Sequence, residues 1–319
     1  MAEDLAYFVW EAADRFIPNA RLTHISSGGN EVYRLVDNDG RSYYLRLTSP
    51  HMRRYEENVA ECQFVVYLFE QGVPVARPIK SPNGHFVEPV MQAGQTWSAS
   101  LFVEAPGVLV KAGGVHWHEP FFRAWGRVLG EMHKAAMGYE GDGRWQWYEE
   151  LWLAQADRLI PLDDTASRRE LDVVLNHFDQ LAKTGDTYGM NHGDFAPGNF
   201  LFDPAQGITI IDFGNCGQHW FMWDITISLS VILWLPDMKR NRIRHWLLRS
   251  YEAVLPIAPK MLAELDWFLR LRMIYVYLSR LWWFGERPSS HQQVILNRLQ
   301  ALVHHPITWE NVHTPTWRI

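Results

Sequence analysis

The chain has 319 residues, of which 47% are hydrophobic and 21% are charged, and its formal net charge is −6. This composition is typical of a globular protein with a buried core, and the length favours two domains or lobes. A negative net charge, without a cluster of basic residues, argues against nucleic acid as the main partner. Two cysteines, Cys62 and Cys216, are too few for a disulfide framework and are consistent with a reducing compartment.

The N-terminal segment MAEDLAYFVWEAADRF contains acidic residues that do not fit a signal peptide. Leu5, Phe8, Val9, Ala12 and Phe16 recur at helical spacing, which predicts an amphipathic helix. The apolar run ITISLSVILWLP is shorter than the about 20 residues that a membrane helix needs. We therefore expect a soluble, cytoplasmic protein with no membrane partner.

The next part of the chain is predicted to be rich in strands. Residues 20–48 contain alternating segments separated by GG and NDG, which predicts a β-meander. A helical pattern covers about 55–70 and stops at Gly72. Three further short strands are predicted in VPVARPIK, HFVEPVM and TWSASLFVE, before APG at 105–107 interrupts the pattern.

Beyond APG the patterns are mainly helical. Helices are predicted at 121–136 and at about 168–183, the second with Ser167 and Glu170 as a capping box and Gly185 as its stop. The exception is 190–213, which contains two short strands joined by PAQG. The predicted fold class is therefore α+β, with a small antiparallel β-rich lobe at 1–104 that has one main helix, and a larger, mostly helical lobe at 105–319.

The stretch NHGDFAPGNFLFD places three polar residues, His192, Asp194 and Asn199, on a tight loop before an apolar strand. The second strand, ITIIDFG, ends in Asp212, a carboxylate that is costly at the end of a buried strand unless something binds it. Asn199 and Asp212 offer the hard oxygen ligands that suit Mg²⁺. Asp194 then remains to accept a hydrogen bond from a hydroxyl.

This spacing matches the kinase template H-R-D-x-x-x-x-N followed by D-F-G. HGDFAPGN has the same His, Asp and Asn spacing, and DFG follows at 212–214. In the alternative, Asp194 caps a turn and Asp212 caps the end of a strand, and the joint spacing arises by chance.

HGDFAPGNFLFD and IDF resemble the signature of the aminoglycoside phosphotransferase and choline kinase group, in which Gly193 stands in place of the Arg of protein kinases. The resemblance covers most of the chain and is strongest at 191–224. It implies a bilobal protein-kinase-like fold, with the nucleotide bound by the N-terminal lobe and the catalytic loop and acceptor site in the C-terminal lobe.

The resemblance also implies roles for individual residues. Asp194 is expected to be the catalytic base, with His192 as the organiser of its loop. Asn199 and Asp212 are expected to bind Mg²⁺. Asp224, in FMWDI, matches an Asp of the family that supports the catalytic loop without reacting.

In such kinases a strand Lys pairs with a helix Glu and holds the nucleotide phosphates. Here Arg46 stands at the strand position, and Glu61, which heads an apolar helical stripe, is its expected partner. Glu57 is the alternative partner, and a surface ion pair that braces strand to helix is the alternative role. Arg also binds phosphate, as a planar fork. Tyr44 stands where the pattern places a small residue against adenine, which leaves both ATP and GTP open.

Two segments resemble further parts of the nucleotide site. SSGGNEVYR resembles the glycine-rich loop over the phosphates, although two glycines between strands also fit an ordinary hairpin. LFVEAPG resembles the hinge, whose backbone groups bind the base. The residues assigned to these two segments are Gly28, Gly29, Asn30, Phe102, Val103 and Glu104.

Two other polar clusters are not expected to be functional. His116, His118 and Glu119 lack a third and fourth metal ligand, so a solvated loop is expected there. His304 and His305 are expected at the surface.

The segment 138–172 lies where family members build the acceptor site. It interleaves tryptophans with acidic residues, a combination that suits an amine or quaternary ammonium group, while an ordinary solvated surface is the alternative. The tryptophans are Trp145, Trp147 and Trp152, and the acidic residues are Glu140, Asp142, Glu149, Glu150, Asp157, Asp163, Asp164, Glu170 and Asp172.

The predicted function is an ATP-dependent, or GTP-dependent, O-phosphotransferase of the alcohol-acceptor class that requires Mg²⁺. Its acceptor is expected to be a small, amine-containing molecule, and aminoglycosides, choline or ethanolamine, and homoserine-like compounds all remain open. The alternatives are a protein Ser/Thr kinase of the same fold and a nucleotide-binding pseudokinase without turnover, the latter motivated by Arg46 and Tyr44.

Overall fold

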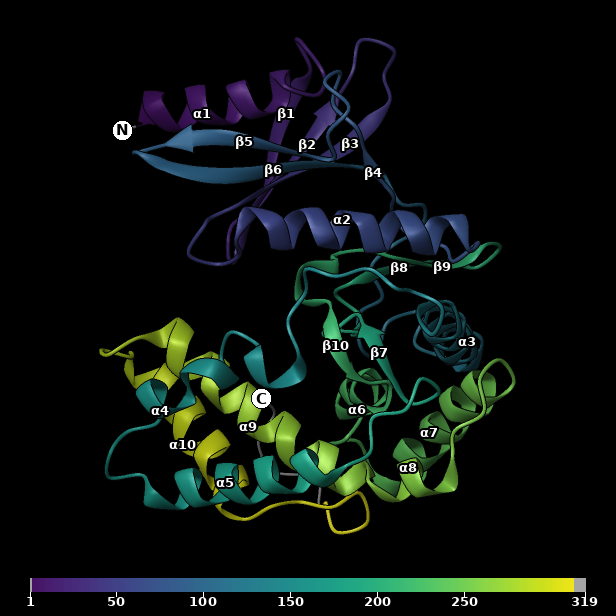
Figure 1. Ribbon diagram of the computed structural model, residues 1–319. Coiled ribbons are helices and arrows are strands. Elements are labelled where there is room, and N and C mark those ends of the chain that lie inside the picture. The colour runs from purple at the N-terminus through teal and green to yellow at the C-terminus, as the bar shows by residue number, and fades with distance from the viewer. Residues whose placement is uncertain (1, 313–319) are drawn as a thin grey trace. The chain divides into compact units, whose positions relative to one another are not determined.

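The computed structural model describes the backbone of residues 2–312 and the side chains of residues 7–312 (Figure 1). The chain divides into two compact units. Unit 1 comprises Met1–Gly114, Gly138–Arg144 and Pro197–Gly214, and unit 2 comprises Val115–Met137, Trp145–Ala196 and Asn215–Ile319.

Unit 1 contains an antiparallel sheet whose strands follow the order β1-β2-β3-β6-β4, with β5 also paired to β6. The predicted meander is confirmed, since β1, β2 and β3 are consecutive neighbours. Of the three strands predicted next, β4 has only two residues, because Pro74 and Pro78 limit ladder hydrogen bonds in that segment. The strands are β1 (Arg21–Ser26), β2 (Asn30–Val36), β3 (Ser42–Thr48), β4 (Pro78–Ile79), β5 (Val87–Gln92) and β6 (Gln95–Val103).

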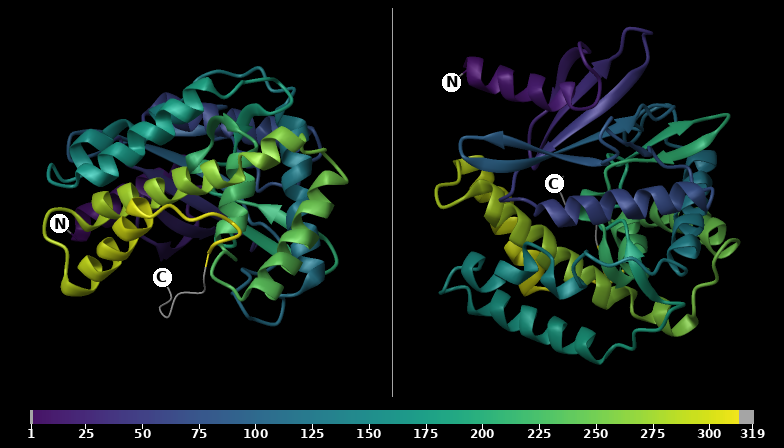
Figure 2. Two further views of the ribbon diagram at one scale, coloured as in Figure 1. Left: turned by 90° about the horizontal axis from the view of Figure 1, so that it is seen from below. Right: turned by 45° about the horizontal axis from the view of Figure 1, so that its top comes forward.

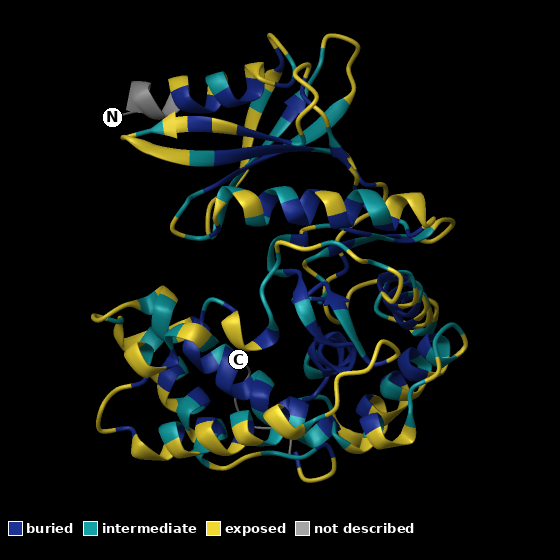
Figure 3. Ribbon diagram, in the orientation of Figure 1, coloured by how far each residue is buried: buried dark blue, intermediate teal, exposed yellow. Residues whose placement is uncertain are grey.

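Helix α1 (Ala2–Asp14) runs along one side of this sheet and α2 (Tyr55–Glu70) along the other (Figures 1 and 2). The predicted apolar face of α1 is buried, because Phe8, Val9 and Ala12 join the core formed by the sheet residues Leu35 and Leu45. Figure 3 shows the same division of α1 into a buried and an exposed face. Leu5, predicted for the same face, lies outside the described side chains.

The predicted hairpin around PAQG is also confirmed and belongs to unit 1. Strands β8 (Phe200–Asp203) and β9 (Gly207–Ile210) pair antiparallel. Asp203 Oδ1 closes the turn by accepting the backbone N–H groups of Ala205 and Gln206 at 2.7 and 3.0 Å. Single bridges at Val75–Ile210 and Val108–Phe202 attach the hairpin to the rest of the unit.

Unit 2 is mostly helical and contains one further ribbon, in which β7 (Tyr188–Asn191) pairs antiparallel with β10 (Gly217–Trp220). Helix α3 packs closely against α7, since a Cβ atom on Gly126 would lie 2.0 Å from the carbonyl oxygen of Leu247. Helices α5, α9 and α10 pack against one another. The helices are α3 (Glu119–Ala136), α4 (Ala156–Leu159), α5 (Thr165–Gln180), α6 (Met222–Ser230), α7 (Asp237–Glu252), α8 (Pro259–Ala263), α9 (Leu265–Phe284) and α10 (Ser290–His304), with short 3₁₀ turns at Trp147–Glu149, Leu153–Gln155 and Phe213–Asn215.

The predicted start and end of α5 are wrong. The helix begins at Thr165, and its N-cap is Asp164, whose carboxylate accepts the backbone N–H of Ser167 at 3.1 Å. Ser167 therefore lies within the first turn. The carboxylate is the stronger acceptor at the positive end of a helix, which explains why it takes the capping position. The helix ends at Gln180, and the chain is already extended at Leu181.

Within residues 2–312, no helix combines the length and the hydrophobicity needed to cross a bilayer.

Candidate active site

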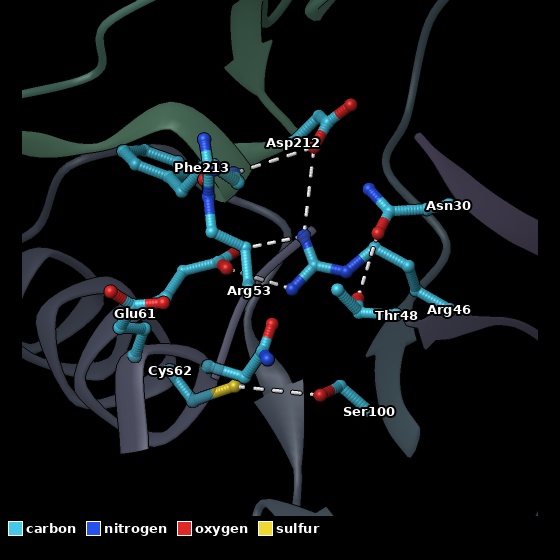
Figure 4. A network of polar contacts seen from close by, with 12 residues as sticks. Asn30, Arg46, Thr48, Arg53, Glu61, Cys62, Ser100, Asp212 and Phe213 are labelled. Atoms are coloured by element: carbon cyan, nitrogen blue, oxygen red, sulfur yellow. Dashed lines mark hydrogen bonds and ion pairs between the residues drawn. The ribbon is translucent and has the colours of Figure 1, made fainter. Parts of the chain in front are cut away.

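Arg46 on β3 and Glu61 on α2 form a buried bidentate ion pair in unit 1 (Figure 4). Nη1 and Nη2 of Arg46 donate to Oε1 and Oε2 of Glu61 at 2.7 and 2.8 Å. The predicted partner of Arg46 is thus confirmed. Glu57, the alternative partner, instead closes a capping box by accepting the backbone N–H of Arg54 at 2.7 Å. The side chains of Arg46 and Glu61 are only 7% and 1% exposed, so the alternative of a surface pair is wrong.

Both members of this pair stay charged although they are buried. Burial disfavours the charged guanidinium, but the adjacent Glu61 carboxylate outweighs this and raises the pKa of Arg46. Burial likewise disfavours the Glu61 carboxylate, yet its contacts with Arg46 lower the pKa of Glu61 below its ordinary value. Arg46 is therefore a fixed cation held by a fixed anion.

Asp212 lies beside this cation in a strained backbone conformation. Its Oδ1 is 3.5 Å from Nη1 of Arg46, and the side chain remains 50% exposed (Figure 4). Its φ of 56° is in the left-handed region, which is uncommon for a non-glycine residue, although Asp tolerates it better than most. Such strain is often found at functional sites. Asp212 is thus an accessible carboxylate in a fixed position.

Asn199 lies next to this strand end, because its backbone carbonyl accepts the N–H of Ile211 at 3.0 Å. The amide oxygen of Asn199 and the carboxylate of Asp212 are the hard donors that suit Mg²⁺, which usually adds phosphate oxygens and waters to one or two protein ligands. The described part of the chain contains no group of three or more His, Cys, Asp or Glu residues that could hold a metal. An ion bound here would therefore need ligands from a nucleotide.

Two arginines that the sequence reasoning missed hold the segment after Asp212. Arg144 Nη2 and Arg53 Nε both donate to the carbonyl oxygen of Gly214, at 2.7 and 3.3 Å. Arg144 also donates through Nη1 to the carbonyl oxygen of Glu57 at 2.9 Å. These contacts tie the DFG segment to α2 and thus to the helix that carries Glu61.

The residues predicted to surround the nucleotide lie on neighbouring strands of the unit 1 sheet. Gly28 and Gly29 form the turn between β1 and β2, and Asn30 at the start of β2 accepts the hydroxyl of Thr48 at 2.7 Å. Arg46, on the same strand as Thr48, has its guanidinium 5.1 Å from the ring centroid of Phe102 on β6. The structure therefore gathers the predicted loop residue, the predicted cation and the first hinge residue within one sheet.

The other two hinge residues have polar contacts within unit 1. The backbone N–H of Val103 donates to the carbonyl oxygen of Arg77 at 3.1 Å. Glu104 is 3.4 Å from Arg34 and accepts the hydroxyl of Tyr44 at 3.5 Å. Partial burial and the Glu104 charge raise the pKa of Tyr44, so its hydroxyl remains a donor near neutral pH.

In unit 2, a buried carboxylate holds the loop that carries Asp194. Asp224 on α6 is fully buried and accepts the backbone N–H groups of His192 and Gly193 at 2.7 and 2.9 Å. His133 on α3 lies 3.2 Å from the same carboxylate. Burial opposes the charge of Asp224, but the contacts with His133 outweigh it and lower the pKa of Asp224. Asp224 has the contacts of a residue that supports the loop.

The geometry of the loop explains its glycine. Gly193 has a φ of +82°, and a Cβ atom there would lie 2.0 Å from the carbonyl oxygen of Asn215. His192 is fully buried, and its Nδ1 accepts the backbone N–H of Asp194 at 3.3 Å. His192 has the contacts of a positioning residue, whereas Asp194 is 36% exposed and can meet a ligand.

The charged partner of Asp194 is a third residue that could not be identified from the sequence. Arg272 on α9 places Nη2 3.7 Å from Oδ1 of Asp194. No local motif indicates Arg272, because 77 residues separate the two positions in the chain.

A small pocket opens beside this loop within unit 2. Its lining includes Gly193, Glu150 and a set of aromatic side chains, namely Trp145, Trp147, Trp223 and Tyr275. Its volume of about 20 Å³ is enough for a single water molecule. Glu150 is buried and accepts the backbone N–H of Trp152 and the hydroxyl of Tyr275 at 3.0 and 3.4 Å.

Two buried polar atoms of this lining lack hydrogen-bond partners within the described chain, Oδ1 of Asn191 and Nε2 of His219. Burial lowers the pKa of His219 to about 3, so the ring is neutral. Its Nδ1 accepts the backbone N–H of Trp220 at 2.9 Å, which leaves the proton on Nε2. Among the described residues, the lining therefore contains one unpaired donor, on His219, and one unpaired acceptor, on Asn191.

Several of the nine acidic residues in the segment predicted to bind the acceptor have structural contacts. Glu170 pairs bidentately with Arg270 at 2.6 and 2.8 Å, Asp164 caps α5, and Glu149 accepts the backbone N–H of Gln146. Of the nine, only Glu150 lines the pocket.

The chain is similar to known phosphotransferases. The family model described as "Phosphotransferase enzyme family" matches residues 21–257. Amicoumacin kinase of Bacillus subtilis (strain 168) is 30% identical over 280 residues, covering 84% of this chain and 82% of that protein. Homoserine kinase of Methylobacillus glycogenes is 26% identical, covering 82% of this chain and 79% of that protein.

One solved structure is similar along almost its entire length. It is amicoumacin kinase hAmiN in complex with AMP-PNP, Ca²⁺ and Ami, with 28% identity, a TM-score of 0.86, and coverage of 97% of this chain and 99% of that one. This likeness confirms the predicted protein-kinase-like fold.

Proposed function

Because the chain belongs to the phosphotransferase enzyme family, we propose that it transfers the γ-phosphate of ATP to a hydroxyl of a small, amine-containing molecule. The observation that carries this proposal is the fixed pairing of Arg46 with Glu61 beside the accessible carboxylate of Asp212. A purely structural ion pair would not need an exposed, strained carboxylate next to it.

On the nucleotide side, Arg46 would bind the α- and β-phosphates. Glu61 fixes its guanidinium, and a planar fork suits phosphate oxygens. Asn199 and Asp212 would hold Mg²⁺, which when bound neutralises charge on the phosphate oxygens. Arg53 and Arg144 would keep the backbone after Asp212 in place through their bonds to Gly214.

On the acceptor side, Asp194 would accept a hydrogen bond from the reacting hydroxyl and then its proton. The transition state of phosphoryl transfer is loose, so orientation of the hydroxyl should contribute more than early proton removal. Asp224 and His192 support this role by fixing the backbone of the loop.

The residues that line the unit 2 pocket support an acceptor that carries an amine, although the pocket itself holds only a group of about the size of a water molecule. Glu150 supplies a buried carboxylate among aromatic rings, a combination that attracts ammonium groups. The likeness to amicoumacin kinase makes amicoumacin the first acceptor to assay. The next acceptors to assay are aminoglycosides, choline, ethanolamine and homoserine.

Arg46 in place of the usual Lys supports one second candidate, a protein that binds nucleotide without turnover. A transfer screen separates the two functions. Purified protein is incubated with ATP or GTP, with Mg²⁺ or with chelator, and with each acceptor or a generic protein substrate, and phosphorylated products are identified by mass spectrometry.

We expect Mg²⁺-dependent phosphorylation of an amine-bearing alcohol by ATP. Thermal stabilisation by nucleotide without any transfer would favour the binding protein. Transfer to the protein substrate alone would favour a protein kinase.

A further inference from the structure

Arg272 on α9 has a guanidinium that lies beside two aromatic rings in unit 2. Its Cζ lies 6.0 Å from the ring centroid of Trp223 and 5.4 Å from that of Tyr275. The side chain is only 14% exposed. Trp223 and Tyr275 also line the pocket beside Gly193, so this cation lies at the edge of the proposed acceptor site.

The hydrogen-bonding capacity of this guanidinium is not used up by the protein. Its Nη2 is 3.7 Å from Oδ1 of Asp194, which is an ion-pair distance but longer than a hydrogen bond. Its Nε is buried and has no hydrogen-bond partner within the described residues. Buried donors are nearly always paired in folded proteins, so an unpaired one needs an explanation.

Arg270, two residues earlier on α9, shows what a satisfied arginine on this helix looks like. Its Nε and Nη2 donate to both oxygens of Glu170 at 2.6 and 2.8 Å, and its guanidinium stacks on Trp267. Arg272 has similar aromatic neighbours but no such bidentate acceptor. Among the described residues, Arg272 lacks an oxygen atom within hydrogen-bonding distance.

We propose that Arg272 binds the acceptor by donating to an oxygen on the carbon next to the one that bears the reacting hydroxyl. This inference rests on the proposed function, because Asp194 would accept the hydroxyl itself. Because Nη2 and Oδ1 are 3.7 Å apart, two oxygens on neighbouring carbons of one small molecule can contact Arg272 and Asp194 together. The preferred acceptors are therefore 1,2-diols and α-hydroxy amides or acids, and isolated alcohols are poor acceptors.

Matched pairs of acceptors test this proposal. Each pair contains an amino alcohol with the neighbouring oxygen and a compound of the same length without it. Steady-state kcat and KM, together with calorimetric Kd in the absence of nucleotide, are measured for the wild type, Arg272→Gln and Arg272→Lys. Arg270→Gln is the control, because it removes the same charge from the same helix.

The wild type should favour the member with the second oxygen by about tenfold or more in KM and Kd, the contribution of a charge-assisted hydrogen bond. Arg272→Gln should lose this preference mainly through KM, and Arg272→Lys should restore part of it. Arg270→Gln should keep it, even if its thermal stability falls.

The outcomes separate this inference from the proposed function. If the wild type transfers phosphate but Arg272→Gln keeps the preference, the inference is overturned and the function stands. If acceptors bind with the expected preference but no phosphate is transferred, the function fails and the inference stands. If no acceptor with a neighbouring oxygen binds or reacts, both are overturned.

Discussion

Replacement of the Arg46–Glu61 pair distinguishes a structural ion pair from a nucleotide-binding one. The two charges are almost completely buried and joined by hydrogen bonds of 2.7 and 2.8 Å. Removal of one partner leaves the other charge buried alone, which costs about 3–5 kcal/mol of unfolding free energy. Arg46→Ala should therefore be strongly destabilised, so any loss of activity in this variant alone is ambiguous.

The double variant Arg46→Met/Glu61→Met removes this ambiguity. Replacement of both charges by apolar residues of similar volume is often close to neutral, so its stability should return to near the wild-type value. The phosphates would still lose a charge-assisted contact worth about 1.5–3 kcal/mol, which corresponds to an increase of about 10- to 150-fold in nucleotide KM. Chemical denaturation and nucleotide-dependent kinetics, measured on wild type, single and double variants, give the two quantities.

A double variant that is stable and has the wild-type nucleotide KM would refute the proposed role of Arg46. The pair would then serve only to join β3 to α2. A double variant that is as unstable as Arg46→Ala would instead refute the energetic argument from burial.

Two further predictions concern the metal and the response to acid. Asp212→Asn should abolish the Mg²⁺-dependent part of the thermal stabilisation by nucleotide. The control is Asp39→Asn, the same change at an exposed turn of unit 1, which should keep this part. Unchanged Mg²⁺ dependence in Asp212→Asn would show that Asp212 is not a metal ligand. Asp164 accepts hydrogen bonds from the side chains of Gln300, Tyr277 and His304. These bonds outweigh the effect of burial and lower the pKa of Asp164. The contribution of Asp164 to stability is therefore present above the pKa of about 3.9 in the unfolded chain, and it is lost as the pH falls through the lower pKa of the folded protein. Asp164→Asn should thus be less stable than the wild type by about 1–3 kcal/mol at pH 7. In denaturation experiments this difference in stability should become smaller below about pH 4. A difference that is independent of pH would contradict the role of the Asp164 charge.

Features with a local periodicity could be predicted from the sequence. Strand alternation and turn residues located β1–β3 and the β8–β9 hairpin, and helical spacing placed Glu61 on the face of α2 that Arg46 meets. The N-cap of α5 was harder to predict, because Asp and Ser are both favourable N-cap residues. Only the contacts of Asp164 with distant residues distinguish it from Ser167 as the N-cap.

Contacts between distant segments were not predictable. Arg144 and Arg53 donate hydrogen bonds to the carbonyl oxygen of Gly214, which is 70 and 161 positions away from them in the sequence. The roles of the acidic residues at 138–172 were hard to predict for a related reason. Charges look alike in a sequence, but Glu170 pairs with the distant Arg270, Asp164 caps a helix, and only Glu150 of the nine lines the pocket.

We expect Asp194 to serve the transfer of phosphate and not the binding of nucleotide. Asp194→Asn keeps the size of the side chain. The hydrogen bonds that hold the loop are donated to Asp224 by the backbone N–H groups of His192 and Gly193, so the substitution does not remove them. Nucleotide titration and single-turnover transfer are measured on the same preparation, with the exposed Asp172→Asn of α5 as the control. We expect unchanged nucleotide affinity and a transfer rate reduced by about 10²- to 10⁴-fold. Transfer at the wild-type rate would contradict this role of Asp194.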